Sequence, residues 1–91
     1  MPEVITLING DSRREVFAGL RSVGHTEFYE AYATDLHPEL KFVLTDYLDY
    51  EGETLVKYNG DLYRVIRFYR TGQEMELTVG RASAEEVALY G

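Results

Sequence analysis

The tetrapeptide Tyr58-Asn59-Gly60-Asp61 restricts the possible folds of this chain more than any other feature. Asn-Gly favours the positive φ angles that a type I′ turn needs at both central residues, and that turn joins two antiparallel strands. β-Branched and aromatic residues on both sides predict strands over 54–58 and 62–70. A second turn at Thr71-Gly72 leads into 75–79, where apolar and polar residues alternate. The second half of the chain is therefore predicted to be a three-stranded antiparallel meander.

The central strand of this meander is apolar on both faces. Strict alternation places Leu62, Ile66 and Phe68 on one face and Tyr63, Val65 and Tyr69 on the other. A strand of this kind must be covered on both sides. One side can face the core, and the other needs a helix, the N-terminal segment or a neighbouring subunit. The same strand carries Arg64, Arg67 and Arg70, which we expect to pair with nearby carboxylates.

The first half of the chain predicts further strands. Residues 4–8 are β-branched and apolar, and 9–12 are turn-forming. We expect 13–15 to form a polar bridge, followed by a strand over 16–23 that Gly19 interrupts. Residues 40–45 alternate as a half-buried strand does.

Two segments have less definite patterns. In 26–33, Thr26 can cap a helix that carries Phe28, Ala31 and Tyr32 on one face. The alternative is a strand with Tyr29, Ala31 and Ala33 on one side. We favour the helix. Residues 82–91 are expected to be a flexible C-terminal tail that forms one or two helical turns on docking, because such a segment is too short to be a stable helix alone.

These elements predict one domain over residues 1–91, with an all-β or β-rich α+β fold. Five or six antiparallel strands would curl into a small β-barrel-like sheet with one short helix. A domain of 91 residues buries only about two-thirds of its unfolded surface, so oligomerisation would help to stabilise it.

Composition disfavours several classes of function. The net charge of −7 argues against binding nucleic acid or an anionic membrane through overall charge. The absence of cysteine excludes disulfides and thiolate sites and is consistent with a reducing cytosol. The start of the sequence shows no signal-peptide pattern, and no apolar stretch approaches the roughly 20 residues that span a bilayer.

No residue pattern predicts catalysis, a cofactor or a metal. His25 and His37 lack spaced partner ligands, and His25-Thr26-Glu27 lacks the cysteines of a zinc deaminase. The acidic run Asp46, Asp49, Glu51 and Glu53 surrounds Gly52, but that glycine is misplaced for a calcium loop. We therefore interpret the run as a solvated acidic loop that pairs with the arginines of the meander, with a weak cation site as the alternative. No serine has a nucleophile elbow or a neighbouring base, so we expect no enzyme.

Five tyrosines, at 47, 50, 58, 63 and 69, crowd into one short region. Tyrosine buries a large ring and keeps a polar hydroxyl, so it suits protein interfaces. Ordinary packing on a small sheet is an equal alternative. Stacking of single-stranded nucleic acid on these rings is disfavoured by the acidic neighbours.

Three motifs occur in one order: Glu27-Phe28-Tyr29-Glu30-Ala31, then Tyr50-Glu51-Gly52-Glu53, then the run Tyr58-Asn59-Gly60-Asp61-Leu62-Tyr63 with its continuation Arg64-Val65-Ile66-Arg67-Phe68-Tyr69. With the closing strand at Glu76-Leu77, this order and spacing resemble the head closure (head–tail connector) proteins of tailed bacteriophages and prophages. The resemblance covers about residues 20–81. The sequence departs from the family pattern at Phe68, where the family often has threonine.

The resemblance implies a structural subunit rather than an enzyme, without a cofactor or a membrane partner. Such subunits form a homo-oligomeric ring between the portal and adaptor proteins and the tail, in the bacterial cytoplasm during assembly and then in the virion neck. A subunit can be monomeric until it meets the adaptor, because ordering its loops costs binding energy. No specific nucleic acid is expected, although DNA would pass through the ring. Acids facing that channel would repel the DNA and let it slide.

The contacts of such a ring are expected on loops, where recognition usually occurs on a rigid scaffold. The predicted loops are 46–53 and 25–38. The candidate interface residues are Tyr47, Asp49, Tyr50, Glu51, Glu53, Phe28, Tyr29 and Tyr32. Alternatives are another neck or tail-terminator protein, or a barrel that binds a ligand or nucleic acid.

Overall fold

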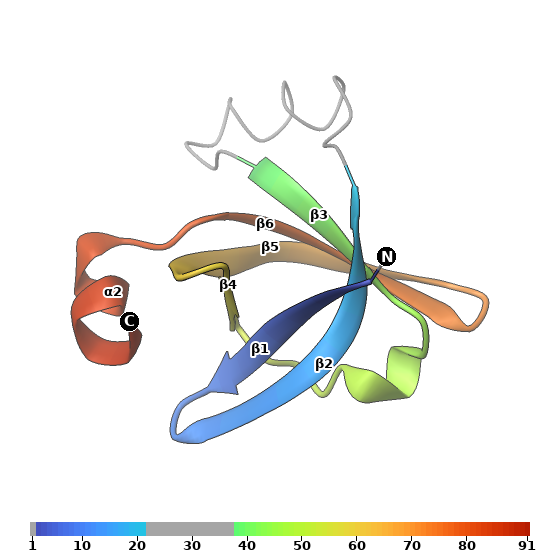
Figure 1. Ribbon diagram of the computed structural model, residues 1–91, viewed down its shortest axis with the longest axis horizontal. Coiled ribbons are helices and arrows are strands. Elements are labelled where there is room, and N and C mark those ends of the chain that lie inside the picture. The colour runs from blue at the N-terminus through green and yellow to red at the C-terminus, as the bar shows by residue number, and fades with distance from the viewer. Residues whose placement is uncertain (1, 22–37) are drawn as a thin grey trace.

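Antiparallel strands close into a small barrel in the part of the chain that the structure describes. The computed structural model describes residues 2–21 and 38–91 (Figure 1). Its strands are β1 (Glu3–Asn9), β2 (Ser12–Arg21), β3 (Pro38–Leu44), β4 (Leu55–Tyr58), β5 (Asp61–Thr71) and β6 (Glu74–Arg81). They follow one another around the barrel in the order β1-β2-β3-β6-β5-β4. The predicted all-β barrel fold is confirmed.

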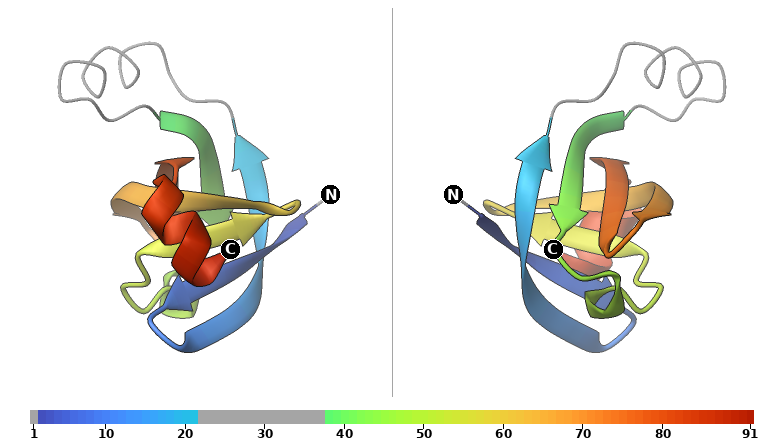
Figure 2. Two further views of the ribbon diagram at one scale, coloured as in Figure 1. Left: turned by 90° about the vertical axis from the view of Figure 1, so that its left-hand side faces the viewer. Right: turned by 90° about the vertical axis from the view of Figure 1, so that its right-hand side faces the viewer.

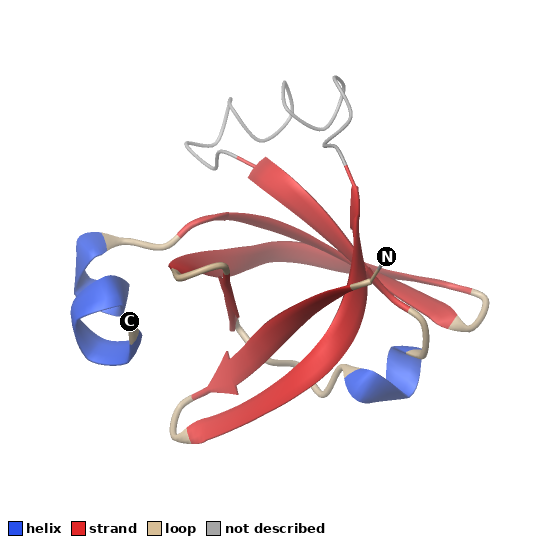
Figure 3. Cartoon of the chain, viewed as in Figure 1, coloured by secondary structure: helices blue, strands red, loops and turns tan. Residues whose placement is uncertain are grey.

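The described residues also form two short helical segments. The 3₁₀ helix η1 (Tyr47–Asp49) lies between β3 and β4, and the α-helix α2 (Ala84–Tyr90) follows β6. Figure 3 shows that they lie on opposite sides of the barrel. The left view of Figure 2 looks from the side of α2, which lies in front of the barrel there.

The predicted meander β4-β5-β6 is present. Asn59 and Gly60, between β4 and β5, have φ angles of 53° and 87°. Positive φ at both positions is what a type I′ turn requires, and asparagine and glycine are the residues that tolerate it best. The local turn chemistry therefore explains this hairpin without help from tertiary contacts.

The barrel interior is filled by side chains from all six described strands. Each strand contributes alternate residues to one apolar cluster, as expected for a small closed barrel. The buried members are Ile5, Leu7, Ala18, Phe42, Leu44, Val56, Tyr63, Met75, Leu77 and Val79. This cluster leaves the ends of the barrel and its outer surface as the places where a partner can bind.

The predicted polar bridge at 13–15 is wrong, because these residues belong to β2. The turn after β1 takes only Gly10 and Asp11, so Asn9 pairs directly with Ser12. The antiparallel ladder then continues without a gap through 13–15 to the end of β2 at Arg21. A two-residue turn thus extends the strand in the N-terminal direction and places Arg14 at an end of the barrel.

The strict alternation predicted for β5 is also wrong. The register between β5 and β6 shifts between Val65 and Arg67. Before the shift Val65 lies opposite Val79, and after it Phe68 lies opposite buried Leu77. Residues directly opposite each other share a face of the sheet. The irregularity therefore moves Phe68 to the inner face of the strand, whereas alternation placed it with Leu62.

The outer face at the start of β5 is covered by the C-terminal segment. Ile8, Leu55 and Leu62 form a second buried cluster, and Ala82 and Tyr90 pack against it. The second covering that we expected for β5 is thus supplied by α2 here. Further along, β5 is exposed from Arg67 to Thr71.

The helix α2 occupies the segment predicted as a C-terminal tail. Ser83 caps its first turn with a capping box, since the Ser83 hydroxyl accepts from the Glu86 N–H and the Glu86 carboxylate accepts from the Ser83 N–H. Two bonds thereby satisfy N–H groups that a helix start leaves without partners. The predicted helix over 26–33 lies outside the described residues.

Candidate interaction surface

The connection between β3 and β4 is tied to the turn between β5 and β6. The Asp46 carboxylate caps η1 by accepting from the Leu48 N–H at 3.0 Å, and it also accepts from the Gln73 amide nitrogen at 3.0 Å. The Tyr47 N–H donates to the Gln73 carbonyl at 2.7 Å. These bonds hold η1 beneath the tip of the β5–β6 hairpin, as both Figure 1 and Figure 2 show.

The other end of this connection is held by a buried ion pair. The Glu53 carboxylate, which is only 3% exposed, lies 2.6 Å from Nη2 of Arg14 on β2. It also accepts from the Glu51 N–H at 2.6 Å. The same Arg14 nitrogen donates to the Asp49 carbonyl at 2.6 Å. Arg14 and Glu53 therefore hold the segment 49–53 against the end of the barrel.

The pair keeps both groups charged. Burial by itself raises the pKa of the Glu53 carboxyl, but hydrogen bonds from Arg14 and from backbone N–H groups outweigh burial, so that the pKa lies below its ordinary value. The hydrogen bond to Glu53 raises the pKa of Arg14. A buried carboxylate with these donors is a structural anchor.

Two aromatic contacts join the connection to β5. The guanidinium of Arg70 lies 3.5 Å from the centre of the Tyr47 ring, a cation–π contact. The Tyr50 and Phe68 rings are 5.3 Å apart, and the Tyr50 hydroxyl donates to the Glu53 carbonyl at 2.7 Å. Burial, and then the charge of Glu53, raise the pKa of that hydroxyl. The connection is therefore braced on both the hairpin and the barrel end.

This braced region exposes large apolar side chains. Leu48 is 64% exposed, Phe68 59% and Tyr69 65%. We call residues 46–53 together with 67–73 the loop–hairpin surface. Apolar side chains on a rigid, hydrogen-bonded support suit protein recognition, because little conformational entropy is lost when they bind.

Five of the predicted interface residues belong to this surface. They are Tyr47, Asp49, Tyr50, Glu51 and Glu53. Phe28, Tyr29 and Tyr32 lie outside the described residues. The prediction that Glu53 is a solvated acid paired with an arginine of the meander is wrong. Glu53 is buried, and its partner is Arg14 on β2. Contact of the surface with other chains stays a prediction.

The arginines of the meander have different partners. Arg64 pairs with Glu86 of α2 at 3.0 Å, as expected for an arginine near a carboxylate. Arg70 instead contacts the Tyr47 ring and donates to the Gly72 carbonyl at 2.9 Å. The sequence showed that β5 carries arginines, but it did not indicate that Arg70 would contact the Tyr47 ring on η1.

Two of the five clustered tyrosines pack inside the barrel. Tyr63 is buried in the core, and the Tyr58 ring lies 5.1 Å from that of Phe42. The Tyr58 hydroxyl donates to the Glu3 carboxylate at 3.0 Å, and this bond raises the pKa of Tyr58. The tyrosine cluster therefore divides between ordinary packing and the loop–hairpin surface.

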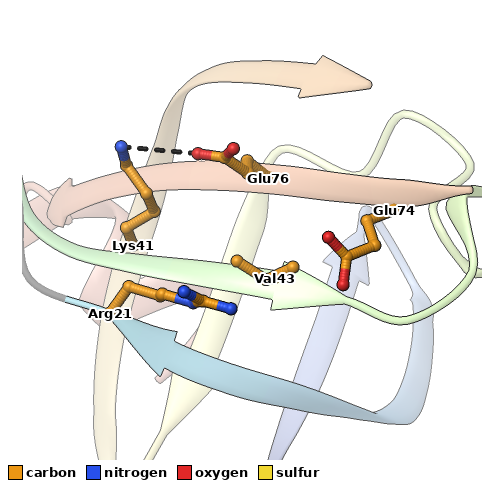
Figure 4. Close-up of a pocket in the computed structure, with 5 residues that line it drawn as sticks. All are labelled: Arg21, Lys41, Val43, Glu74 and Glu76. Atoms are coloured by element: carbon orange, nitrogen blue, oxygen red, sulfur yellow. Dashed lines mark ion pairs between the residues drawn. The ribbon is translucent and has the colours of Figure 1, made fainter. Parts of the chain in front are cut away.

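A second candidate surface is a groove on the outside of β2, β3 and β6. It measures about 280 Å³ and is lined by Arg21, Lys41, Val43, Glu74 and Glu76. Figure 4 shows Lys41 and Glu76 paired, at 3.4 Å, on one side, with Arg21 and Glu74 at either end of Val43. Its charges are of both signs, so the groove selects no one class of ligand by charge.

Within residues 2–21 and 38–91, no group of three or more His, Asp or Glu side chains is placed to hold a metal ion. In the same part of the chain no helix is both long enough and apolar enough to cross a membrane.

In comparisons with known proteins, no protein-family model matches this chain and no curated protein matches its sequence significantly.

Proposed function

We propose that this protein is a structural subunit that joins the head of a tailed phage or prophage to its tail. It would assemble as a homo-oligomeric ring between the portal and adaptor proteins and the tail. The subunits would assemble in the bacterial cytoplasm and remain in the neck of the virion, without acting as an enzyme. The observation that carries this proposal is the loop–hairpin surface, where the family-like motifs that the structure describes, at 50–53 and 58–69, meet.

The motifs within the described residues occupy connected positions in the fold, whereas 27–31 lies outside them. Residues 50–53 follow η1 and end in the buried Glu53. Residues 58–69 form the β4–β5 hairpin and its extension, and Glu76-Leu77 lies on β6 beside that extension. The first two of these segments touch through Tyr50 and Phe68. Residues that resemble the family in sequence thus support one surface, which favours a shared role in docking.

Phe68, where the sequence departs from the family pattern, has a defined place. It lies on the inner side of β5 against Tyr50 and is still 59% exposed. A threonine there would make neither the ring contact nor the apolar exposed area. The departure therefore enlarges the apolar part of the surface, as a partner with a matching apolar pocket would need.

The acids of this region have separate roles. Asp46 caps η1 and Glu53 is buried with Arg14, whereas Glu51 has a side chain that is 69% exposed. If acids line a DNA channel, Asp49 and Glu51 are the ones to test. The variant Asp49→Asn/Glu51→Gln should slow DNA ejection from assembled particles and leave ring assembly unchanged. Ejection at the wild-type rate would remove the channel hypothesis without affecting the docking proposal.

The docking proposal is tested by adding the purified protein to portal–adaptor complexes and imaging the particles by electron microscopy. We expect an additional ring of density below the adaptor. The variant Leu48→Ser should weaken its formation, because it removes an apolar side chain that is 64% exposed. Leu89→Ser, which alters a leucine on α2 that is 73% exposed, is the matched control.

Failure of the wild-type protein to add a ring to any portal–adaptor complex from the same genome would contradict the proposal. Tight binding of single-stranded oligonucleotide at physiological salt would favour the alternative, a barrel that binds nucleic acid.

A further inference from the structure

The β5–β6 hairpin extends past the strand that flanks it. Pairing between β4 and β5 ends at Leu55 and Arg64, followed by one more bond from the Val65 N–H to the Thr54 carbonyl. Beyond this point β5 runs on to Thr71, paired only with β6. Figure 1 shows the hairpin reaching further to the right than any other described element.

The backbone groups on the far side of this extension can be identified from the turn. Thr71 and Glu74 flank a two-residue turn, so they exchange both of their hydrogen bonds. In an antiparallel ladder hydrogen-bonded and non-hydrogen-bonded pairs alternate. The N–H and C=O groups of Phe68 and Arg70 therefore point away from β6. No backbone–backbone bond to either residue occurs on that side among the described residues.

This edge carries positive charge on an acidic protein. Residues 65–73 contain no acidic residue, whereas the whole chain has a net charge of −7. Arg64, at the start of the strand, is already paired with Glu86. The Arg70 guanidinium contacts the Tyr47 ring and the Gly72 carbonyl. Both partners are neutral, so the charge of Arg70 is retained beside the exposed edge.

We propose that the edge of β5 at 67–71 binds an acidic, extended segment of a partner protein by β-strand addition. The backbone groups of Phe68 and Arg70 would bond the incoming strand, which gives affinity. Arg70 would select acidic side chains on that strand, which gives specificity. Phe68 and Tyr69, exposed on the two faces of β5, would each pack against its apolar residues.

Charge disfavours the two main alternatives. A second copy pairing through the same edge would place arginine-bearing strands side by side, and like charges directly opposite each other are destabilising. A nucleic acid would be attracted to the arginines but repelled by the acidic protein, and it offers no strand backbone to pair with the edge. The proposal is independent of the head–tail function, because it follows from the edge and its charge alone.

The test uses a synthetic peptide of alternating valine and glutamate as the probe, with a valine–lysine peptide of equal length as its control. We expect the acidic peptide to bind at least about tenfold more tightly. Amide exchange measured by NMR should slow at Phe68 and Arg70. Equal affinity for the two peptides, or protection of amides elsewhere only, would overturn the proposal.

Two variants separate backbone pairing from side-chain contact. Phe68→Pro removes the outward N–H and leaves the bonds to β6, whereas Phe68→Val removes the ring and keeps the N–H. We expect Phe68→Pro to weaken binding of the acidic peptide by more than Phe68→Val does. If Phe68→Pro fails to fold, the same comparison is made with a peptide N-methylated at alternate residues, which should bind at least about tenfold more weakly.

Charge is tested with Arg70→Gln, for which Lys57→Gln on β4 is the control. The first should lose most of the preference for the acidic peptide, and the second should keep it. Protection of Phe68 and Arg70 in the concentrated protein without peptide would show self-pairing and overturn the proposal. Tighter binding of an oligothymidylate than of the acidic peptide at the same edge would overturn it as well.

Discussion

Arg14 and Glu53 lie 39 residues apart in the sequence and form the shortest ion pair among the described residues, at 2.6 Å. Arg14 is on β2, and Glu53 lies two residues before the start of β4. The Glu53 carboxylate is buried, whereas the Arg14 side chain is 34% exposed. The pair closes one end of the barrel and supports the loop–hairpin surface, so its loss should affect both stability and docking.

Replacing Glu53 by glutamine should destabilise the protein by about 2 kcal/mol, because a charged hydrogen bond is lost and a buried polar group remains. The measurement is the free energy of unfolding from urea denaturation. Glu51→Gln is the control, since Glu51 lies 3.7 Å from the same guanidinium but is largely exposed. It should change stability by no more than about 0.5 kcal/mol. Equal losses in the two variants would contradict an anchoring role for Glu53.

Stability should fall as the pH is lowered through the range in which Glu53 titrates. Its pKa is lowered in the folded protein. The stabilisation is therefore fully present above the unfolded value of about 4.3 and is lost as the pH falls towards the folded value. Glu53→Gln lacks this contribution, so its free energy of unfolding should fall less steeply between about pH 5 and about pH 3.

Glu86 has a lowered pKa too, because hydrogen bonds from Ser83 and the charge of Arg64 outweigh its burial. Part of the acid sensitivity should therefore remain in Glu53→Gln. Identical pH profiles for this variant and the wild type would show that Glu53 does not carry the effect.

Tyr90 should stabilise the barrel although it lies one residue from the end of the sequence. It packs on the outer cluster of Ile8, Leu55 and Leu62, so Tyr90→Ala should cost about 1–2 kcal/mol of stability. Leu89→Ala, in the same turn of α2 but 73% exposed, should cost no more than about 0.5 kcal/mol. The stabilities of the two variants are compared by thermal unfolding. If Tyr90→Ala were as stable as Leu89→Ala, α2 would not cover the outer cluster in solution.

The effect of a substitution at Asn59 on stability should depend on how well the new residue adopts a positive φ angle, not on the size of its side chain. The φ angle of Asn59 is 53°, so Asn59→Val should destabilise the protein by about 1–2 kcal/mol, since a β-branched residue is strained there. Asn59→Gly should be tolerated within about 0.5 kcal/mol because glycine adopts this conformation readily. Urea denaturation distinguishes the two outcomes, and equal stability of both variants would argue against a type I′ turn.

Local patterns in the sequence were sufficient to predict the meander and the barrel class. Asn59-Gly60 determines a hairpin through its own backbone preferences. The alternation in 75–79 correctly predicts that Met75, Leu77 and Val79 face the core, but not that Thr78 on the other face is buried as well. Five of the candidate interface residues lie in one connection, at 47–53, and their contact with other chains stays a prediction.

Long-range relationships were decided only by the tertiary structure. Nothing near Glu53 in the sequence indicates that Arg14 is its partner, since that contact depends on closure of the barrel. The irregularity at Ile66, which turns Phe68 towards Tyr50, depends on the register between two strands rather than on either strand alone. Local propensity thus determined which elements form, whereas side-chain partners were set by how those elements pack.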